Sequence, residues 1–156
     1  MAFMKKAKVR HDNARYPEQL ERMRRLEREV GCFFCHGNYL KVGAAPAIKN
    51  GKYWFVKKND YPYEGAVCHY LIASKVHLNK ITQITPKAWV ELLKTISWLE
   101  KYLMVKGASL FARSGDMSYT GATLDHLHFH LLVGGKKKKG GKLKDNILVT
   151  LGHKST

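Results

Sequence analysis

Three histidines alternate with apolar residues in the C-terminal half of this chain. They are His126, His128 and His130, within the run HLHFHLL at residues 126–132. Successive side chains of a β-strand point to opposite faces, so the imidazoles should share one face and the apolar residues the other. A solvent-facing polar stripe would explain the alternation but not the choice of histidine three times. Because imidazole is a nucleophile, a metal ligand and a proton carrier near neutral pH, the row predicts covalent catalysis on phosphorus, a metal site, or both.

The segment before these histidines is rich in hydroxyl groups and glycine. Residues 118–123 read SYTGAT. Hydroxyl side chains and flexible backbone amides around a glycine can form a concave site for anions. The segment therefore predicts a phosphate-binding loop beside the histidine row.

Three cysteines, Cys32, Cys35 and Cys68, form a second set of reactive side chains. An odd number cannot all pair, and a reducing compartment keeps thiols free, so the spacing of Cys32 and Cys35 favours metal binding over a disulfide. Cys-x-x-Cys with two distant histidines is a common tetrahedral zinc set, and the alternative is two small buried thiols. The run CFFCH at residues 32–36 also fits the haem-attachment pattern, which needs export and a separate axial ligand and is not favoured.

The length of 156 residues, with 45% hydrophobic content, suffices for one compact core and not for two ordinary domains. We expect a basic N-terminal arm at residues 1–16 and a single domain at 17–156 that carries a basic loop at 134–144. The formal net charge of +16 favours a polyanionic partner, although a solvated loop explains the lysine block at 136–139 equally well. No apolar run approaches a membrane span and residues 1–15 lack the apolar stretch of a secretion signal, so we expect a cytoplasmic protein without membrane contact.

Hydrophobic periodicity predicts the elements that must position these residues. An amphipathic helix is expected at 18–30, opened by Pro17 and ended by Gly31, and a longer helix begins at Thr85-Pro86. The apolar face of the longer helix is expected to comprise Trp89, Leu92, Leu93, Ile96, Leu99 and Leu103. Strands are expected at residues 53–56, 67–73, 108–112, 127–133 and 147–151. This order predicts an α+β domain whose mainly antiparallel sheet is covered by helices on one side.

Residues 126–132 resemble the signature of the histidine-triad (HIT) superfamily, His-φ-His-φ-His-φ-φ with φ apolar, at every position. Further stretches are similar to the family in the right order. NDYPY at 59–63 and HYLIASKVH at 69–77 resemble its ribose-contacting turn and its strand H-x-L-V-x-P-x-x-H, and CFFC at 32–35 resembles its opening segment. The resemblance covers roughly residues 30–133.

The resemblance implies a HIT-like fold, often homodimeric, and a set of catalytic residues. The middle triad histidine of the family attacks the α-phosphorus of a nucleotide, and by position this is His128. His130 would bind a phosphate oxygen, and Thr123 would lie by the bridging oxygen or the leaving group. His126 completes the triad.

The nucleotide-binding residues implied by the resemblance are Asn59 for the ribose, Phe33 and Phe34 for the nucleobase, and Thr123 and His130 for the phosphate. Core packing is an alternative role for either phenylalanine. The chain departs from the family at Ala122, where many members have a polar side chain, and at Ser74, where many have proline. Asn59 itself replaces the acid that is usual in the purine-nucleoside phosphoramidases.

The resemblance also implies a metal. In the branch that contains galactose-1-phosphate uridylyltransferase and some diadenosine polyphosphate phosphorylases, similar cysteines join the strand-end histidine and the first triad histidine. The corresponding residues here are Cys32, Cys35, His77 and His126. They would hold a structural zinc that pins the first helix to the catalytic strand. NDYP at 59–62 also looks more like this branch than like the phosphoramidases.

Together these features predict an enzyme that hydrolyses or transfers a nucleotide at the α-phosphate of a nucleotide conjugate. It would be a histidine-triad hydrolase, nucleotidyltransferase or phosphorylase, and a homodimer. Nucleic acid is a second candidate partner because of the basic surface. Two alternatives stay open: a nucleic-acid deadenylase resembling aprataxin, and a non-catalytic module that binds a nucleotide or nucleic acid.

Overall fold

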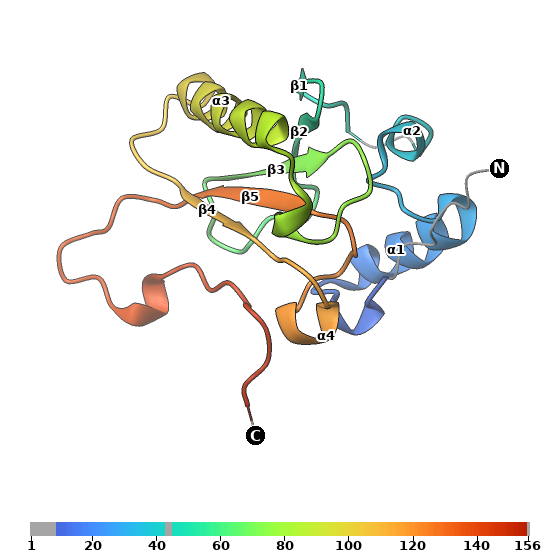
Figure 1. Cartoon of the computed structure of the whole chain (residues 1–156). Helices are drawn as coiled ribbons and strands as arrows, with labels where there is room; N and C mark the ends of the chain where they lie inside the picture. The colour runs from blue at the N-terminus through green and yellow to red at the C-terminus, as the bar shows by residue number, and fades with distance from the viewer. Residues whose placement is uncertain (1–8, 43–44, 156) are drawn as a thin grey trace.

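The structure is a computed structural model that describes residues 9–42 and 45–155. Among these residues, five antiparallel strands form one sheet in the order β1-β2-β3-β5-β4 (Figure 1). The strands are β1 (Lys49–Asn50), β2 (Trp54–Lys58), β3 (Cys68–Ser74), β4 (Ser109–Ala112) and β5 (His128–Val133). The α-helices are α1 (Pro17–Val30), α2 (His36–Tyr39), α3 (Pro86–Tyr102) and α4 (Met117–Thr120), with 3-10 turns at His11–Asn13, Ile81–Gln83 and Leu143–Asp145. The expected α+β fold with a mainly antiparallel sheet is confirmed.

The two long helices begin where the sequence predicted. α1 starts at Pro17, and Gly31 follows its last turn with a φ of 72°, a positive value that glycine adopts at little cost. α3 starts at Pro86, and the side-chain oxygen of Thr85 caps it by accepting a hydrogen bond from the backbone N–H of Ala88. Both starts depend on local backbone chemistry, which is why the sequence alone could predict them.

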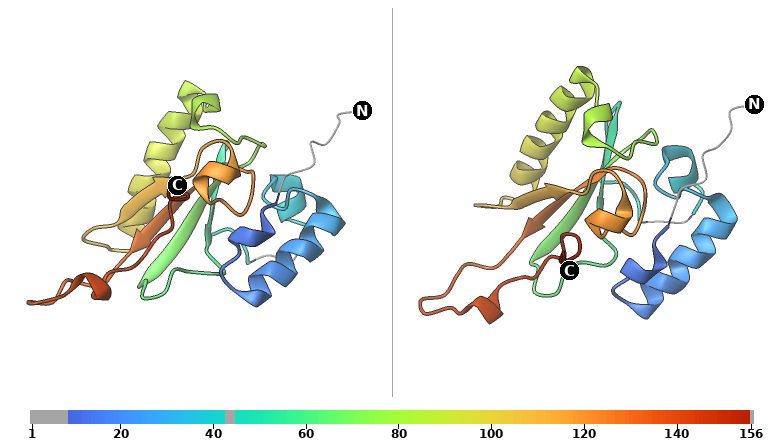
Figure 2. Two further views of the ribbon diagram at one scale, coloured as in Figure 1. Left: turned by 90° about the horizontal axis from the view of Figure 1, so that it is seen from below. Right: turned by 60° about the horizontal axis from the view of Figure 1, so that its bottom comes forward.

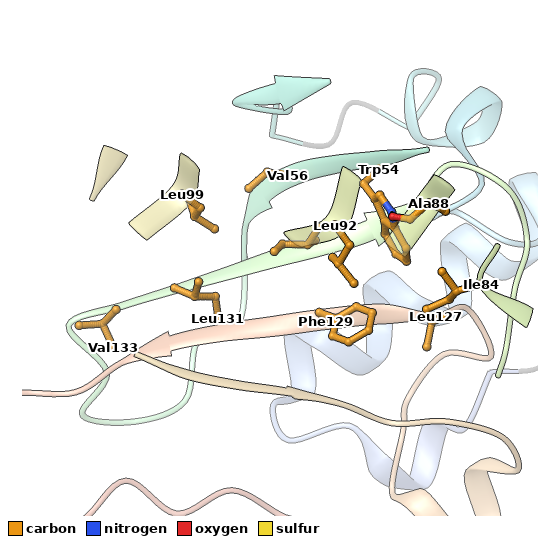
Figure 3. Packing of buried hydrophobic residues seen from close by; sticks show 11 residues of the cluster. Trp54, Val56, Ile84, Ala88, Leu92, Leu99, Leu127, Phe129, Leu131 and Val133 are labelled. Carbon is orange, nitrogen blue, oxygen red and sulfur yellow. The ribbon is translucent and has the colours of Figure 1, made fainter. Parts of the chain in front are cut away.

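The main hydrophobic core lies between α3 and one face of the sheet (Figure 3). Trp54 from β2, Leu92 from α3 and Phe129 from β5 are all buried in it. The indole Nε1 of Trp54 donates to the carbonyl of Ala88 at 2.8 Å, so its polar atom has a partner inside the core. Because buried apolar surface stabilises a fold by roughly 25 cal/mol per Å², this layer holds the central strands in place.

The buried face of α3 is rotated from the expected one. Its buried residues are Ala88, Leu92, Thr95 and Leu99. The prediction is wrong for Trp89 and Leu93, whose side chains are 42% and 68% exposed. Apolar residues occupy more of the helix circumference than the sheet can cover, so helical spacing alone admits two neighbouring faces.

A second layer covers the opposite face of the sheet. α1 and α2 lie on the side away from α3 (Figure 2). Tyr39 of α2 packs on Phe55 of β2 with ring centroids 4.6 Å apart, and Phe55 has no exposed surface. Helices therefore flank both faces of the sheet, whereas the sequence predicted cover on one side only.

The N-terminal residues that the structure describes run along the segment before the histidines. Val9 forms an antiparallel bridge with Leu124, and the backbone N–H of Arg10 donates to the carbonyl of Thr123 at 3.0 Å. The side-chain amide of Asn13 donates to the carbonyl of Ala122 at 2.7 Å. The first eight residues of the expected basic arm lie outside the described residues.

The strand expected at residues 147–151 is absent, and the prediction is wrong. These residues pair with no strand in the described part of the chain, and Leu148 and Leu151 are 77% and 67% exposed. The apolar run there forms no buried face. The carbonyl of Thr150 instead accepts a hydrogen bond from Arg113 at 2.6 Å. Within the described ranges, no helix combines the length and the hydropathy needed to cross a membrane.

Candidate active site and metal centre

The histidine run divides its side chains between the two faces of the sheet. Leu127, Phe129 and Leu131 belong to the core under α3. On β5, His128 and His130 pair with Ala73 and Leu71 of β3, and their ring centroids lie 4.8 Å apart. His126 lies just outside this regular geometry, in a bend before β5 begins. The alternation predicted from the sequence therefore holds within β5.

Four candidate metal ligands converge beside the start of β5. They are Cys32 and Cys35 between α1 and α2, His77 after β3, and His126. One ligand atom from each lies within 4.8 Å of every other. Sγ of Cys32 is 3.2 Å from Nδ1 of His126, and Sγ of Cys35 is 3.6 Å from Nδ1 of His77. In a tetrahedral zinc site, ligand distances of about 2.3 Å for sulfur and about 2.0 Å for nitrogen place sulfur and nitrogen about 3.5 Å apart. The donor set and its spacing therefore fit a tetrahedral ion, and the cluster can hold a metal.

The backbone of β3 holds the other side of the His126 ring. Nε2 of His126 lies 2.7 Å from the backbone carbonyl of Ser74, and the Ser74 hydroxyl is 3.1 Å from the same nitrogen. A carbonyl only accepts, so Nε2 carries the proton and Nδ1 directs its lone pair toward the cysteines. Ser74, one of the departures from the family pattern, thus supports a candidate ligand.

The two thiols of the cluster have opposite pKa shifts. The hydrogen bond from Cys32 lowers the pKa of Cys35 to about 4 although burial opposes the shift. The hydrogen bond to Cys35, with burial, raises the pKa of Cys32. One thiolate is therefore present without a metal, and a divalent cation would stabilise both thiolates.

A cleft opens over the face of the sheet that carries His128 and His130. The space between its lining residues, with the open mouth included, is about 970 Å³. Met23 and Leu26 of α1 contribute apolar wall. All the predicted nucleotide-binding residues line it, namely Asn59, Phe33, Phe34, Thr123 and His130. His126, predicted both as a catalytic residue and as a ligand, is not among the lining residues and faces the cysteines instead.

His128 is held with one ring nitrogen free. Its Nδ1 lies 2.7 Å from the backbone carbonyl of His126, so Nδ1 carries the proton. Burial lowers the pKa of His128 to about 4, although that backbone hydrogen bond opposes the shift. The ring is therefore neutral near pH 7, and Nε2 keeps its lone pair. Phe34 packs edge-on against the ring with centroids 5.2 Å apart. A neutral, oriented imidazole can act as a nucleophile.

His130 belongs to a chain of buried polar groups. Its Nδ1 is 2.8 Å from Nε2 of His69 on β3, so one of these rings donates to the other. On its other side, Nη1 of Arg113 lies 3.3 Å from Nε2 of His130. Burial, with the nearby positive groups, lowers the pKa of His69 to about 4 and that of His130 well below its usual value. Both rings are thus neutral hydrogen-bonding groups near pH 7.

The residues predicted for the ribose and the nucleobase already have protein partners. Oδ1 of Asn59 accepts from the backbone N–H of Tyr61 at 3.0 Å, and Nδ2 lies 3.2 Å from the His69 ring. Phe33 and Phe34 pack edge-to-face with centroids 5.3 Å apart. Phe34 also packs against His128, which agrees with the alternative role of core packing for this residue. Both phenylalanine rings line the cleft.

The predicted phosphate-binding loop is partly helical. Asp116 caps α4 by accepting from the backbone N–H of Ser118 at 2.8 Å. Gly121 then adopts a left-handed φ of 68°, which turns the chain back toward the sheet. Residues 121–124 line the cleft, whereas residues 118–120 belong to α4 and are not among its lining residues. The second half of the segment, which includes Thr123, is therefore the part available to a ligand.

A sequence model of the HIT domain matches residues 62–137, which contain β3, β5 and the whole histidine run. The chain therefore contains a HIT domain. A solved structure described as a HIT-like protein is 26% identical, with 60% of this chain and 91% of that chain covered and a TM-score of 0.51.

Two further structures share the fold of this HIT protein. A HIT family hydrolase from Clostridium thermocellum is 24% identical, with 73% of this chain and 97% of that chain covered and a TM-score of 0.56. A zinc-bound histidine triad family protein from Mycobacterium smegmatis is 21% identical, with 69% and 78% covered and a TM-score of 0.50. No curated protein gives a significant match.

Sequence reasoning missed two residues that line the cleft of this HIT protein, Arg15 and Arg113, and the buried His69 beside His130. His69 is the first residue of the stretch HYLIASKVH, so its place in a family-like motif was a usable signal. Arg113 contacts His130 and Arg15 lies over the ring of Tyr63, yet neither arginine stands in a motif. Their positions follow from the packing of distant segments, which no local pattern encodes.

Proposed function

We propose that this HIT protein cleaves or transfers a nucleotide at the α-phosphate of a nucleotide conjugate, through a nucleotidyl intermediate on His128. The observation that carries the proposal is the hydrogen bond from Nδ1 of His128 to the carbonyl of His126. It leaves the unprotonated Nε2 of a neutral imidazole at the open cleft that the predicted nucleotide-binding residues line. The likeness to HIT family hydrolases supports the same reaction class.

In the first step, Nε2 of His128 bonds to the α-phosphorus. The bond from phosphorus to the leaving-group atom breaks, and its electron pair departs with the leaving group. Thr123 is proposed to lie by this bridging atom, and His130 beside the phosphate oxygens. Charge that builds on the phosphoryl group would be stabilised by the positive groups that line the cleft.

In the second step, an acceptor attacks the phosphorus of the nucleotidyl-histidine. Its oxygen bonds to phosphorus, the phosphorus–nitrogen bond breaks, and the electron pair returns to Nε2 of His128. The proton of the acceptor passes to solvent. With water the reaction is hydrolysis, and with phosphate or a sugar phosphate it is phosphorolysis or nucleotidyl transfer. Asn59 is proposed to hold the ribose and Phe33 with Phe34 the nucleobase during both steps.

The intermediate can be detected directly. Purified protein is mixed with adenylated and guanylated small molecules, with and without phosphate, quenched within the first turnover, and analysed by intact mass. We expect a gain of one nucleoside monophosphate that maps to the peptide containing His128. An adduct on another residue, or product formation at the normal rate by a His128→Asn variant, would contradict the assignment.

We further propose that zinc occupies the cluster of Cys32, Cys35, His77 and His126 and has a structural role. None of the four ligand residues lines the cleft, so a cation there need not touch the substrate. Bound zinc would tie the turn after α1 to the start of β5. Metal analysis of protein purified without added zinc should find about one zinc per chain. Metal-free protein with all four residues intact would contradict this role.

A second candidate function is removal of adenylate from nucleic-acid ends. The net charge of +16 and the exposed lysines at 136–139 favour it. Oligonucleotide binding that weakens steeply with salt would support this function, and no binding at low salt would remove its main support. The homodimer stays a prediction, which the molar mass in solution would test.

A further inference from the structure

The cleft holds more positive charge than the α-phosphate alone requires. Its charged lining side chains, among the described residues, are the cations Arg15, Arg22, Lys57 and Arg113 and the carboxylate Asp60. Oδ2 of Asp60 lies 3.0 Å from Nη1 of Arg22 and 2.7 Å from Nζ of Lys57. The carboxylate therefore pairs with both of these cations and offsets one of their two charges. Neither Arg15 nor Arg113 forms a salt bridge with any residue that the structure describes.

The two uncompensated guanidinium groups meet at one tyrosine. The guanidinium carbon of Arg15 lies 4.0 Å from the centroid of the Tyr63 ring. Nη2 of Arg113 donates to the Tyr63 hydroxyl at 2.8 Å. Arg15 comes from the segment before α1 and Arg113 follows β4, so the chain brings two cations together from distant positions.

Neutral groups hold both guanidiniums in place. Nη2 of Arg15 donates to the carbonyl of Tyr61 at 2.6 Å, and Nη2 of Arg113 donates to that of Thr150 at 2.6 Å. Carbonyl and hydroxyl oxygens fix a guanidinium without cancelling its charge. The buried Nε of Arg113 has no hydrogen-bond partner among the described residues. Both side chains are therefore positioned as cations with unused capacity for an anion.

Arg113 also places this charge next to the reaction centre. Its Nη1 is 3.3 Å from Nε2 of His130, and the His130 ring is 4.8 Å from the ring of the proposed nucleophile, His128. An anion that extends beyond the α-phosphate past His130 would therefore meet Arg113 first and the Arg15 side of Tyr63 next.

The geometry points to a second anion subsite, formed by Arg15 and Arg113, that binds ionised phosphates of the leaving group. The substrate class is a nucleotide joined by a phosphoanhydride to further phosphates, as in dinucleoside polyphosphates, rather than a phosphoramidate with an amine leaving group. This assignment rests on the proposed reaction of His128. The bond between the α-phosphorus and the bridging oxygen breaks, the oxygen keeps the electron pair, and the arginines stabilise the departing phosphate.

Binding tests the subsite without any turnover. In a His128→Asn background without divalent cations, calorimetry compares AMP with ATP and GMP with GTP. We expect the triphosphate of the preferred base to bind about tenfold or more tightly than its monophosphate. Arg15→Gln and Arg113→Gln should each remove most of that gain, and Arg113→Lys should keep part of it. Lys94→Gln, which removes a charge on the exposed side of α3, is the matched control and should keep all of it. A gain that survives in the Arg15/Arg113 double variant overturns the subsite.

Turnover then tests the substrate class in the otherwise unaltered protein. Diadenosine tetraphosphate, a 5′-adenylated DNA oligonucleotide and an adenosine 5′-phosphoramidate are compared by kcat/KM. The arginine variants should lose about tenfold more activity on the phosphoanhydrides than on the phosphoramidate, and an equal loss on both overturns the class. A higher kcat/KM for adenylated DNA than for diadenosine tetraphosphate would mean that the leaving-group phosphate belongs to a nucleic-acid end. If the unaltered protein turns over none of these compounds, the proposed reaction fails, while the binding comparison still decides the subsite.

Discussion

The imidazoles of His126 and His128 stand two residues apart and face different chemistry. His126 meets two thiols and the ring of His77, with a backbone carbonyl of β3 behind it. His128 faces an open cleft with positively charged lining, and its other neighbours are aromatic rings. The difference comes from the segments that pack next to each histidine. The turn that carries Cys32 and Cys35 packs next to His126. The cleft, with residues of α1 in its wall, opens next to His128.

One bond connects these two environments. The side chain of His126 belongs to the metal cluster, while its backbone carbonyl accepts from Nδ1 of His128. A metal held by the cluster would therefore fix the atom that sets the tautomer of the proposed nucleophile. We therefore expect the cluster to fix the geometry of the site and the cleft to carry the proposed chemistry, so each can be disturbed separately.

The largest expected effect comes from breaking the cleft alone. His128→Asn removes the nucleophile, so turnover should fall by about 10³-fold or more. Because the ring belongs to neither the main core nor the metal cluster, the thermal midpoint and metal content should stay near those of the native protein. Steady-state kinetics and metal analysis measure both. His153→Asn, an exposed histidine near the C-terminus, is the control. Loss of metal in His128→Asn would show that the two regions are not separable.

Breaking the cluster alone should cost stability before activity. Cys32→Ala removes a buried ligand, so we expect loss of metal and a fall in unfolding free energy on the order of 3 kcal/mol or more. Denaturant unfolding with metal analysis measures this. Cys68→Ala, a cysteine outside the cluster, should retain the metal. An unchanged metal content in Cys32→Ala would contradict the ligand set.

The neutral histidines of the cleft should make stability depend on pH. The pKa of His69 is about 4 in the folded chain, below the value of about 6.5 for an unfolded histidine, so the unfolded state binds more protons between these values. This contribution is complete above about pH 6.5 and is lost as the pH falls toward 4. Between about pH 7.5 and about pH 5, the native protein should lose about 1–2 kcal/mol more of its unfolding free energy than His69→Asn loses. The same pH dependence in both proteins would mean that His69 is not held neutral.

The smallest expected effect tests whether Ser74 orients His126 as a metal ligand. Ser74→Ala removes the hydroxyl near Nε2 of His126 but leaves the backbone carbonyl that accepts from it. Metal affinity should fall by about tenfold, as for other partners that orient a ligand, with little change in kcat. Competition with a chelator measures the affinity. A change in kcat larger than the change in metal affinity would place Ser74 in the chemistry instead.

The elements that could be predicted are those whose signals are local. Proline and threonine mark the starts of α1 and α3, and the alternating histidine run marks β5. The segment at 147–151 is a short apolar run typical of a strand. A strand, however, needs a partner and a buried face, and neither is determined by the segment itself. The rotated face of α3 fails for the same reason, since the sheet decides which apolar residues it covers.

The candidate site divides along the same line. The sequence by itself determined the residue types, the alternation of the histidines and the four cysteine and histidine positions that the family resemblance selects, because spacing along one strand and within one short turn is a property of the local chain. Only the tertiary structure decided that His126 turns to the thiols while His128 faces the cleft. It also decided that Arg15 and Arg113 line that cleft, with His69 buried beside His130. Those positions depend on contacts between segments far apart in the chain, and such contacts exist only once the sheet and both of its layers have packed.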